Sequence, residues 1–307
     1  MAIKALFFAI PFLMLSIAIT GVILSITSYS YFLKTINQDY RNIIKGSTGE
    51  ILLYMQSARN GLESLAWIMT AIKPDPWQKK MALTAFNHIH PEFLSLSMIS
   101  NTGENVVSTG VVETRAVLGQ SDTIEKALSG QKAVSHIMFN KEAVPYVHMA
   151  VPIMHLGKID HVLLGELNLK SVWDVLESVK IGDTGKIFIT DLTGRIIGDS
   201  EIQHVINSTT ATPISQEALI KINGSPDPVE WNGEREGVCY YFLGYAIPDL
   251  DWIIVLGQTS KEIYVHVYRS IYLGIGITVF ICLIAGLLGW NTINRFLAPI
   301  HEMHHQV

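Results

Sequence analysis

The chain has 307 residues, of which 49% are hydrophobic and only 16% are charged. A charged fraction this far below the usual ~25% excludes an ordinary soluble enzyme. Between Lys34 and Arg269 lie 20 of the 22 Lys and Arg residues but 26 of the 27 Asp and Glu residues. This central region is therefore acidic and lacks the basic surface that a nucleic-acid partner requires.

The first predicted element is a membrane-spanning helix over residues 1–33. No Asp, Glu, Lys, Arg or His occurs from Ala5 to Leu33, and ~20 apolar residues are enough to cross a bilayer. The apolar stretch exceeds the ~7–15 residues of a signal-peptide core, and no A-x-A cleavage site follows it. We therefore expect an uncleaved membrane anchor.

A long stalk helix is predicted next, over residues 34–74. Its apolar residues recur in steps of four and three, at Ile51, Met55, Ala58, Leu62, Leu65, Met69 and Ile72. This period of about 3.5 is typical of a helix that packs lengthwise on a partner. Two interpretations remain open. The stripe packs against the chain's own sheet, or it also forms a parallel homodimer contact.

Residues 75–180 form the first of two predicted modules. Asp75 and Pro76 are typical of a helix N-cap and first helical position, and they predict a helix over residues 77–88. Beyond it, the alternation of residues 93–99 and the turn at residues 101–103 predict an antiparallel hairpin.

The same pattern returns 91 residues later, so residues 181–269 form the second module. Tyr146–Pro152 resembles Tyr241–Pro248, and each is followed by a dense apolar strand and a helical stretch. A period of ~90 residues is too long for a solenoid. The sequence therefore predicts an α+β fold with two tandem antiparallel-sheet modules, and the last helix runs directly into a second membrane helix over residues 270–291.

Several short strings of the central region carry a resemblance through their order. They are Ala150–Ile153, Gly165–Lys170 with Trp173-Asp174, Ile181–Gly185 with Ile187–Asp191, and Asp251-Trp252. Residues 30–270 thereby resemble the double Cache sensor region of bacterial transmembrane receptors, most of all Cache-bearing sensor histidine kinases. The resemblance implies two PAS-like modules outside the bacterial inner (plasma) membrane, a role in signal transduction, and no cofactor.

The end of the chain resembles the opening of a HAMP linker, over residues 292–307 with Pro299 at the early proline position. A full HAMP unit and an output domain need many more residues. The chain is therefore expected to be a receptor fragment, or a receptor that signals through a cytoplasmic partner, without a catalytic domain of its own. Such receptors act as dimers, and Gly286 and Gly289 would allow close packing of membrane helices in a homodimer.

Two other functions are weighed against the histidine kinase sensor. The same architecture serves the sensor regions of chemoreceptors and nucleotide cyclases. A membrane metalloprotease is the other alternative, because His301, Glu302 and His305 satisfy H-E-x-x-H. Catalytic zinc needs a third ligand and a substrate cleft, so we expect a solvated helix face there and no catalytic residue.

Ligand binding is therefore the expected chemistry, on one face of the first sheet. Alternation assigns Val147, Met149, Val151 and Ile153 to the face that packs on the stalk helix, and Tyr146, His148 and Ala150 to the opposite face. Neighbouring strands are expected to add His136 and Met98 to that opposite face. Arg115, in the loop of residues 111–120, would grip a carboxylate with two hydrogen bonds. The prediction is a small polar ligand, such as a carboxylate.

An amino-acid ligand is not predicted, because the Arg-x-Trp-Tyr string of amino-acid-binding double Cache receptors is absent. Other motifs are expected to be structural. His88 and His90 could chelate a metal only in an extended segment, so no metal site is predicted. The glycines at Gly182 and Gly185 lack the Lys-Ser/Thr of a phosphate-binding loop.

Overall fold

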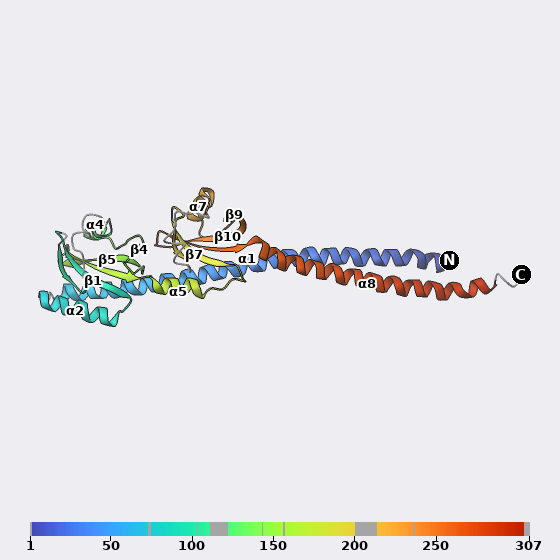
Figure 1. Cartoon of the computed structure of the whole chain (residues 1–307), viewed down its shortest axis with the longest axis horizontal. Coiled ribbons are helices and arrows are strands. Elements are labelled where there is room, and N and C mark those ends of the chain that lie inside the picture. The colour runs from blue at the N-terminus through green and yellow to red at the C-terminus, as the bar shows by residue number, and fades with distance from the viewer. Residues whose placement is uncertain are drawn as a thin grey trace.

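The computed structural model describes residues 2–72, 75–102, 104–110, 122–142, 144–155, 157–199, 214–235 and 237–303. The molecule is elongated, with two sheets placed one after the other along a single helix, α1 (Ala2–Ile72) (Figure 1). A second long helix, α8 (Ser260–Met303), leaves the second sheet and runs beside the first part of α1. The predicted membrane helix and stalk are therefore one continuous helix.

The apolar stripe of α1 packs against the chain's own sheets. Ile51, Met55 and Leu62 are 0%, 2% and 0% exposed and belong to the core that both sheets share with α1. This confirms the first interpretation of the stripe. A homodimer contact through the same residues is wrong, because they are already covered within one copy.

The distal sheet, farthest from the apolar helices, is antiparallel. Its strand order is β2-β1-β6-β5-β3, and β4 also pairs with β5. Helix α2 precedes the sheet and begins with a capping box between Asp75 and Gln78. The elements are α2 (Pro76–Ile89), β1 (Phe93–Ser100), β2 (Asn105–Ser108), α4 (Asp122–Leu128), β3 (Ala133–Val134), β4 (Met138–Phe139), β5 (Pro145–His155) and β6 (Lys158–Asn168).

The proximal sheet repeats this arrangement. Its order, β8-β7-β11-β10-β9, matches the β2-β1-β6-β5-β3 path of the distal sheet, with β9 in the place of β3, which confirms two tandem modules of one type. Each sheet also has a glycine that faces a phenylalanine ring of a neighbouring strand, because a Cβ added to Gly165 would press on Phe93 and one added to Gly257 would press on Phe242. The elements are α5 (Lys170–Ser178), β7 (Lys186–Asp191), β8 (Ile196–Asp199), α7 (Gln216–Asn223), β9 (Val229–Arg235), β10 (Val238–Ile247) and β11 (Trp252–Thr259).

A second, smaller core lies on the face of the distal sheet that points away from α1. Helix α4 covers this face near the far end of the molecule (Figure 1). The core unites Ile99, Ile124, Ala127, Ala150, Val162 and Leu164. The distal sheet therefore has two buried faces, and the one under α4 is only partly apolar.

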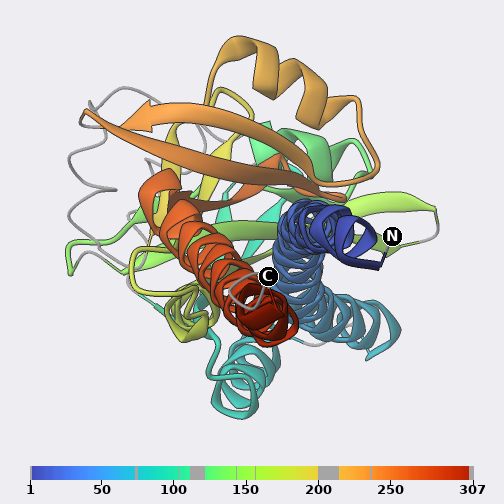
Figure 2. The same ribbon diagram turned by 90° about the vertical axis from the view of Figure 1, so that its right-hand side faces the viewer.

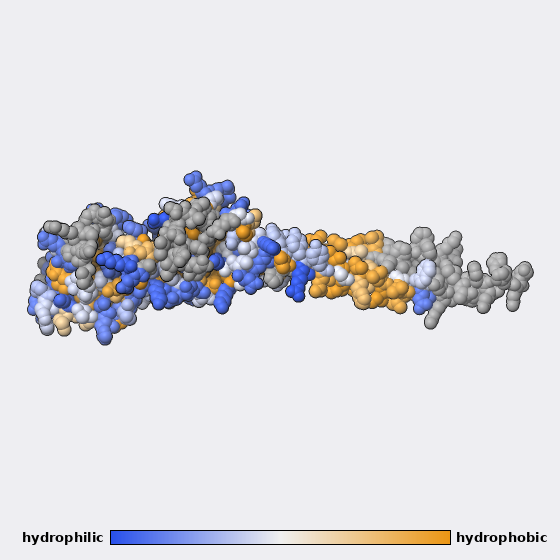
Figure 3. Space-filling model, in the orientation of Figure 1, coloured by the Kyte–Doolittle hydropathy of each residue, from blue (hydrophilic) through white to orange (hydrophobic). Residues whose placement is uncertain are grey.

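Helices α1 and α8 each contain a segment long and apolar enough to cross a membrane. Figure 3 shows these segments as a hydrophobic band beyond the proximal sheet, and the end-on view of Figure 2 shows the two helices side by side. They approach closely at Gly21, where an added Cβ would overlap the Thr278 side chain. Gly274 likewise lies against Ser25. Small residues thus let the two helices pack within one chain. The predicted contact of Gly286 and Gly289 between two copies stays a prediction.

Candidate functional site

The strand β5 alternates as the sequence predicts. Val147 and Met149 are buried in the core with α1, whereas Ala150 lies under α4 on the other face. Tyr146 and His148 share that other face and are partly buried. We call this side of the distal sheet, away from α1, the outer face.

Three polar side chains form a row across the outer face, one from each of three neighbouring strands. Glu166 on β6 is the register partner of both Ser95 on β1 and His148 on β5. The His148 Nε2 atom lies 3.6 Å from the Glu166 carboxylate, and both side chains are largely enclosed. Ser95 is buried and its hydroxyl donates to Glu166. We call Ser95, Glu166 and His148 the outer polar row.

Glu166 in the outer polar row is ionised at neutral pH. Contact with His148 is the main cause that holds the pKa of Glu166 below its usual value. Desolvation by burial acts in the opposite direction, and the hydrogen bond from Ser95 supports the carboxylate form. An ionised, half-enclosed carboxylate of this kind accepts hydrogen bonds strongly.

Polar neighbours extend the row at both sides. The Tyr146 ring lies 5.6 Å from the His148 ring, and burial together with the negative charge of Glu166 raises the pKa of Tyr146, so its hydroxyl remains a donor. Ser97 donates a 3.0 Å hydrogen bond to Ser108 on the edge strand β2. The outer face thus offers one carboxylate, hydroxyl groups and an imidazole beside the apolar core under α4.

The predicted ligand residues have different positions. Tyr146 and His148 lie together on the outer face, as expected. His136 is exposed in the connection between β3 and β4, next to Ser135, whose hydroxyl accepts from the His148 backbone N–H. The prediction that Met98 lies on the same face is wrong, because Met98 is 1% exposed and belongs to the core with α1. Arg115 lies outside the described residues.

Glu166 and Ser95 are the site residues that the sequence interpretation missed. The signal was a carboxylate within the apolar strand that includes Val162 and Leu164, together with serines at alternate positions of β1. Strand alternation places each of them on a face. Alternation does not determine which residues of different strands lie opposite each other. That depends on the strand register, which places Glu166 opposite His148.

A second polar cluster joins the proximal sheet to the start of α8. The Glu262 carboxylate, in the first turn of α8, accepts hydrogen bonds from the backbone N–H groups of Asp183 and Thr184 at 2.7 and 2.9 Å and from the Thr184 hydroxyl. Gly182 has a φ of 55°, and a Cβ there would overlap this carboxylate. The glycine-rich turn therefore holds the chain's own carboxylate. We call these residues the α8 junction.

The α8 junction also reaches α1, because the Gln258 side chain in β11 is hydrogen-bonded to Glu262 and accepts from the Tyr40 hydroxyl. Desolvation raises the pKa of Glu262, but the hydrogen bonds from Thr184 and from the backbone N–H groups outweigh it, and the pKa is lower than usual. The carboxylate is ionised at neutral pH and stays in its N–H cradle.

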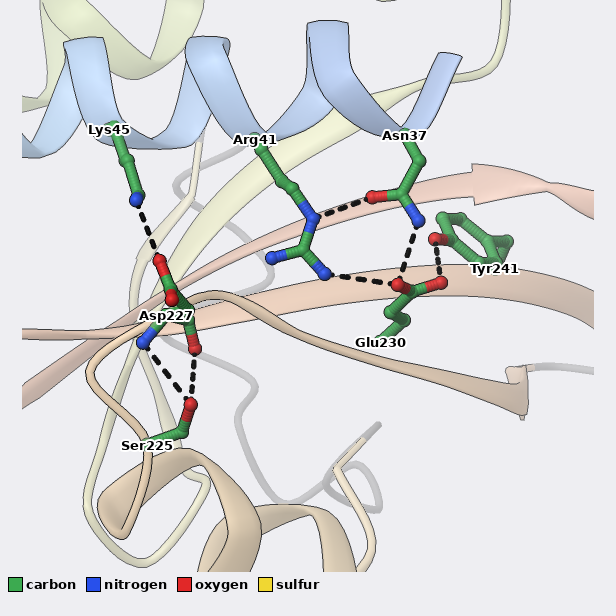
Figure 4. A network of polar contacts seen from close by, with 7 residues as sticks. All are labelled: Asn37, Arg41, Lys45, Ser225, Asp227, Glu230 and Tyr241. Atoms are coloured by element: carbon green, nitrogen blue, oxygen red, sulfur yellow. Dashed lines mark hydrogen bonds and ion pairs between the residues drawn. The ribbon is translucent and has the colours of Figure 1, made fainter. Parts of the chain in front are cut away.

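Ion pairs fasten the edge of the proximal sheet to α1 (Figure 4). Glu230 on β9 accepts from Asn37 at 2.7 Å, Arg41 at 3.0 Å and Tyr241 at 2.7 Å. One turn farther along α1, Lys45 pairs with Asp227 at 2.8 Å. Exposed ion pairs stabilise little individually. Their value here is that they fix the orientation of α1 next to its membrane segment.

Metal and disulfide chemistry finds no support in the part of the chain that the structure describes. No three His, Cys, Asp or Glu side chains there lie close enough to hold a metal ion. His90 stacks on Phe86 and pairs with Glu92, while His88 is exposed. Cys239 and Cys282 are both free. The motif at His301 stays a prediction, because His305 lies outside the described residues.

Comparison with known proteins gives structural relatives only. No family model matches the sequence, and no curated protein sequence matches it significantly. The ligand-binding domain of Mlp24 with asparagine is 13% identical, with a TM-score of 0.60 over 78% of this chain and 98% of that one. The extracellular domain of the putative histidine kinase mmHK1S-Z2 is 13% identical, with a TM-score of 0.61 over 75% of this chain and 99% of that one.

A third neighbour is the ligand-binding domain of the Pseudomonas aeruginosa PAO1 amino-acid chemoreceptor PctC in complex with GABA. It is 18% identical, with a TM-score of 0.56 over 73% of this chain and 99% of that one. These neighbours are sensor domains, and each is matched over 98–99% of its own length. The chain therefore has the double Cache sensor fold, as its sequence resemblance indicated.

Proposed function

We propose that this protein is a bacterial transmembrane receptor whose two modules lie outside the inner membrane and sense a small molecule. One observation carries the proposal: the sensor fold continues without a break into two apolar helices, α1 and α8. A rigid connection of this kind passes a change in the modules to the membrane. A soluble binding protein has no need of it.

The ligand site that we propose is the outer polar row with Tyr146. Glu166 accepts hydrogen bonds from a ligand, so the ligand carries an ammonium or another N–H or O–H donor. Arg115 stays the predicted partner of a ligand carboxylate, and His136 stays a predicted contact. The neighbours bound to asparagine and GABA support a small polar ligand that carries both groups, although the sequence did not favour an amino acid.

The signal would leave the modules through the α8 junction. Ligand binding on the distal sheet shifts α1, and the Tyr40 and Glu262 contacts pass this shift to the first turn of α8. An ångström-scale piston or rotation of the helices would then bias a two-state cytoplasmic linker.

The test is calorimetric titration of the full chain in lipid nanodiscs with a panel of amines, amino acids and carboxylates. We expect one amine-bearing compound to bind with a Kd below about 1 mM, which corresponds to about 4 kcal/mol. Glu166→Gln and His148→Gln should each weaken it by at least about tenfold, or about 1.4 kcal/mol. Glu142→Gln removes an exposed carboxylate from the same module and should leave binding unchanged.

Two results would contradict this function. If no compound of the panel binds at millimolar concentration, the sensor proposal loses its basis. If Glu142→Gln weakens binding as much as Glu166→Gln, the effect is general electrostatics and the outer polar row is not the site.

For the output, we propose a histidine kinase reached through the HAMP-like segment of residues 292–307, with no catalysis in this chain. A chemoreceptor or a nucleotide cyclase is the alternative output. Phosphotransfer that depends on ligand, after co-expression with candidate cytoplasmic kinases, would separate the first from the others. Zinc-dependent peptidase activity lost in Glu302→Gln would instead establish the metalloprotease.

A further inference from the structure

A cavity of about 330 Å³ lies at the far tip of the molecule, on the α1 side of the distal sheet. Met69 and Thr70 at the end of α1, Met98 on β1 and Ile153 on β5 line it. It is separate from the outer polar row, because Met98 and Ile153 belong to the core between this sheet and α1. We call it the tip cavity.

The tip cavity also has a polar wall that comes from three elements. Lys79 is on α2, His155 ends β5, and Asp160 and His161 lie on β6. Asp160 pairs with Nδ1 of His161 at 2.9 Å. This contact fixes the ring and leaves Nε2 of His161 as the atom available for another partner. Asp160 itself is 59% exposed, so water screens much of its charge.

Neither Lys79 nor His155 uses its side chain in a hydrogen bond or ion pair within the part of the chain that the structure describes. Lys79 is only partly exposed and its ammonium group can donate three hydrogen bonds. An ammonium group beside apolar surface, with no partner of its own, favours an anion that supplies the missing acceptors, and an imidazole N–H is a further donor.

The apolar floor limits what that anion is. Side chains of Met69, Met98 and Ile153 leave room for a short carbon chain or a compact group, and ligand cavities start at about 300 Å³. Two imidazoles and one ammonium match an oxyanion better than a halide, because an oxyanion presents several acceptor oxygens. A metal ion does not fit, since Lys79 is a fixed positive charge in the wall.

We propose that the tip cavity is a second binding site, which takes a small oxyanion, a carboxylate or a phosphate, through Lys79, His155 and His161. The site is independent of the function proposed for the outer polar row. A ligand there contacts Met69 and Thr70, so it binds directly to the end of α1 opposite the membrane.

Calorimetric titration of the full chain in nanodiscs tests the proposal with two probes, inorganic phosphate and succinate. We expect at least one of them to bind at a single site. Lys79→Gln and His155→Gln should each weaken that binding at least tenfold. Lys80→Gln is the matched control, because it removes the same charge from the neighbouring exposed position of α2, and it should change the affinity less than twofold.

Glu166→Gln serves as the second control and should leave oxyanion binding intact, which separates this site from the outer polar row. Binding of phosphate alone or succinate alone supports the site and identifies the anion. The proposal is overturned if neither probe binds, or if Lys80→Gln weakens binding as much as Lys79→Gln. Thermal melting of every variant shows whether a loss of binding comes from a loss of folding.

Discussion

Single carboxylates connect segments of this protein that are far apart in the sequence, and Glu262 is the clearest case. Its side chain satisfies two backbone N–H groups of a turn that lies nearly eighty residues earlier in the chain. Loss of the charge leaves those donors without a strong acceptor. Hydrogen bonds to a charged group contribute about 1.5–3 kcal/mol, and partial exposure reduces this.

We predict that Glu262→Gln destabilises the proximal module by about 1 kcal/mol at pH 7, because an amide supplies only one acceptor oxygen. The folded-state pKa of Glu262 is lower than the ordinary 4.5. Its contribution is therefore complete above pH 4.5 and disappears as the pH falls through the folded-state pKa. Thermal melting of both proteins between pH 7 and pH 3 should show the difference shrinking with acid.

Glu234→Gln is the control for this experiment, since Glu234 is an exposed residue of β9 in the same module. It should melt like the unmodified protein at every pH. A gap between Glu262→Gln and the unmodified protein that grows in acid would show that the carboxylate does not stabilise the turn.

At the scale of elements, two glycines set how closely the strands approach their neighbours. A Cβ on Gly165 would lie 2.8 Å from the Phe93 ring and 3.1 Å from Leu62 of α1. Both neighbours are buried and have little room to move. In the proximal sheet, a Cβ on Gly257 would lie 2.6 Å from the ring of Phe242, its register partner on β10.

We predict that Gly165→Ala and Gly257→Ala each destabilise the protein by about 1–3 kcal/mol through overpacking. Gly46→Ala should do the reverse and stabilise by about 0.5–1 kcal/mol, because its Cβ meets open space and alanine favours the helix. Chemical unfolding in detergent micelles measures all three. Equal stability of the two strand variants and the unmodified protein would show that the sheets adjust freely.

At the scale of the whole molecule, the face of α1 that points away from both sheets remains uncovered. Leu53 and Trp67 are 69% and 72% exposed, and Asn60 lies midway between them at the same seven-residue spacing. Among the exposed residues of α1 from Gly46 to Ala71, Glu50 is the one with a charge. A face this poor in charge is unusual for a helix in water.

We predict that a homodimer of this receptor forms through this uncovered face of α1 rather than through the apolar stripe. Two copies anchored in one membrane are parallel, so equivalent residues meet at a twofold axis. In a background with Cys239→Ser and Cys282→Ser, Leu53→Cys and Trp67→Cys should crosslink in membranes, while Leu62→Cys should not. Crosslinking through Leu62→Cys alone would contradict the packing of α1 on its own sheets.

Local patterns in the sequence determined the elements of this protein. The period of 3.5 in residues 51–72 predicted the stalk, and alternation in β5 predicted that Tyr146 and His148 share a face. The repeated strings predicted two sheets of one topology. These features depend on neighbours a few residues apart, because side-chain direction in a helix or strand follows directly from the backbone period.

Only the tertiary structure decided which groups meet. The role of Glu166 depends on its contacts with Ser95 and His148. The turn at Asp183 is held by hydrogen bonds to Glu262, and Gly182 leaves the space for that carboxylate. The tertiary structure also decided that the stripe on α1 faces the chain's own sheets, and that Met98 lies on the α1 side. The physical reason is that contacts across strands and between distant elements follow from register and packing, and no period along the chain encodes them.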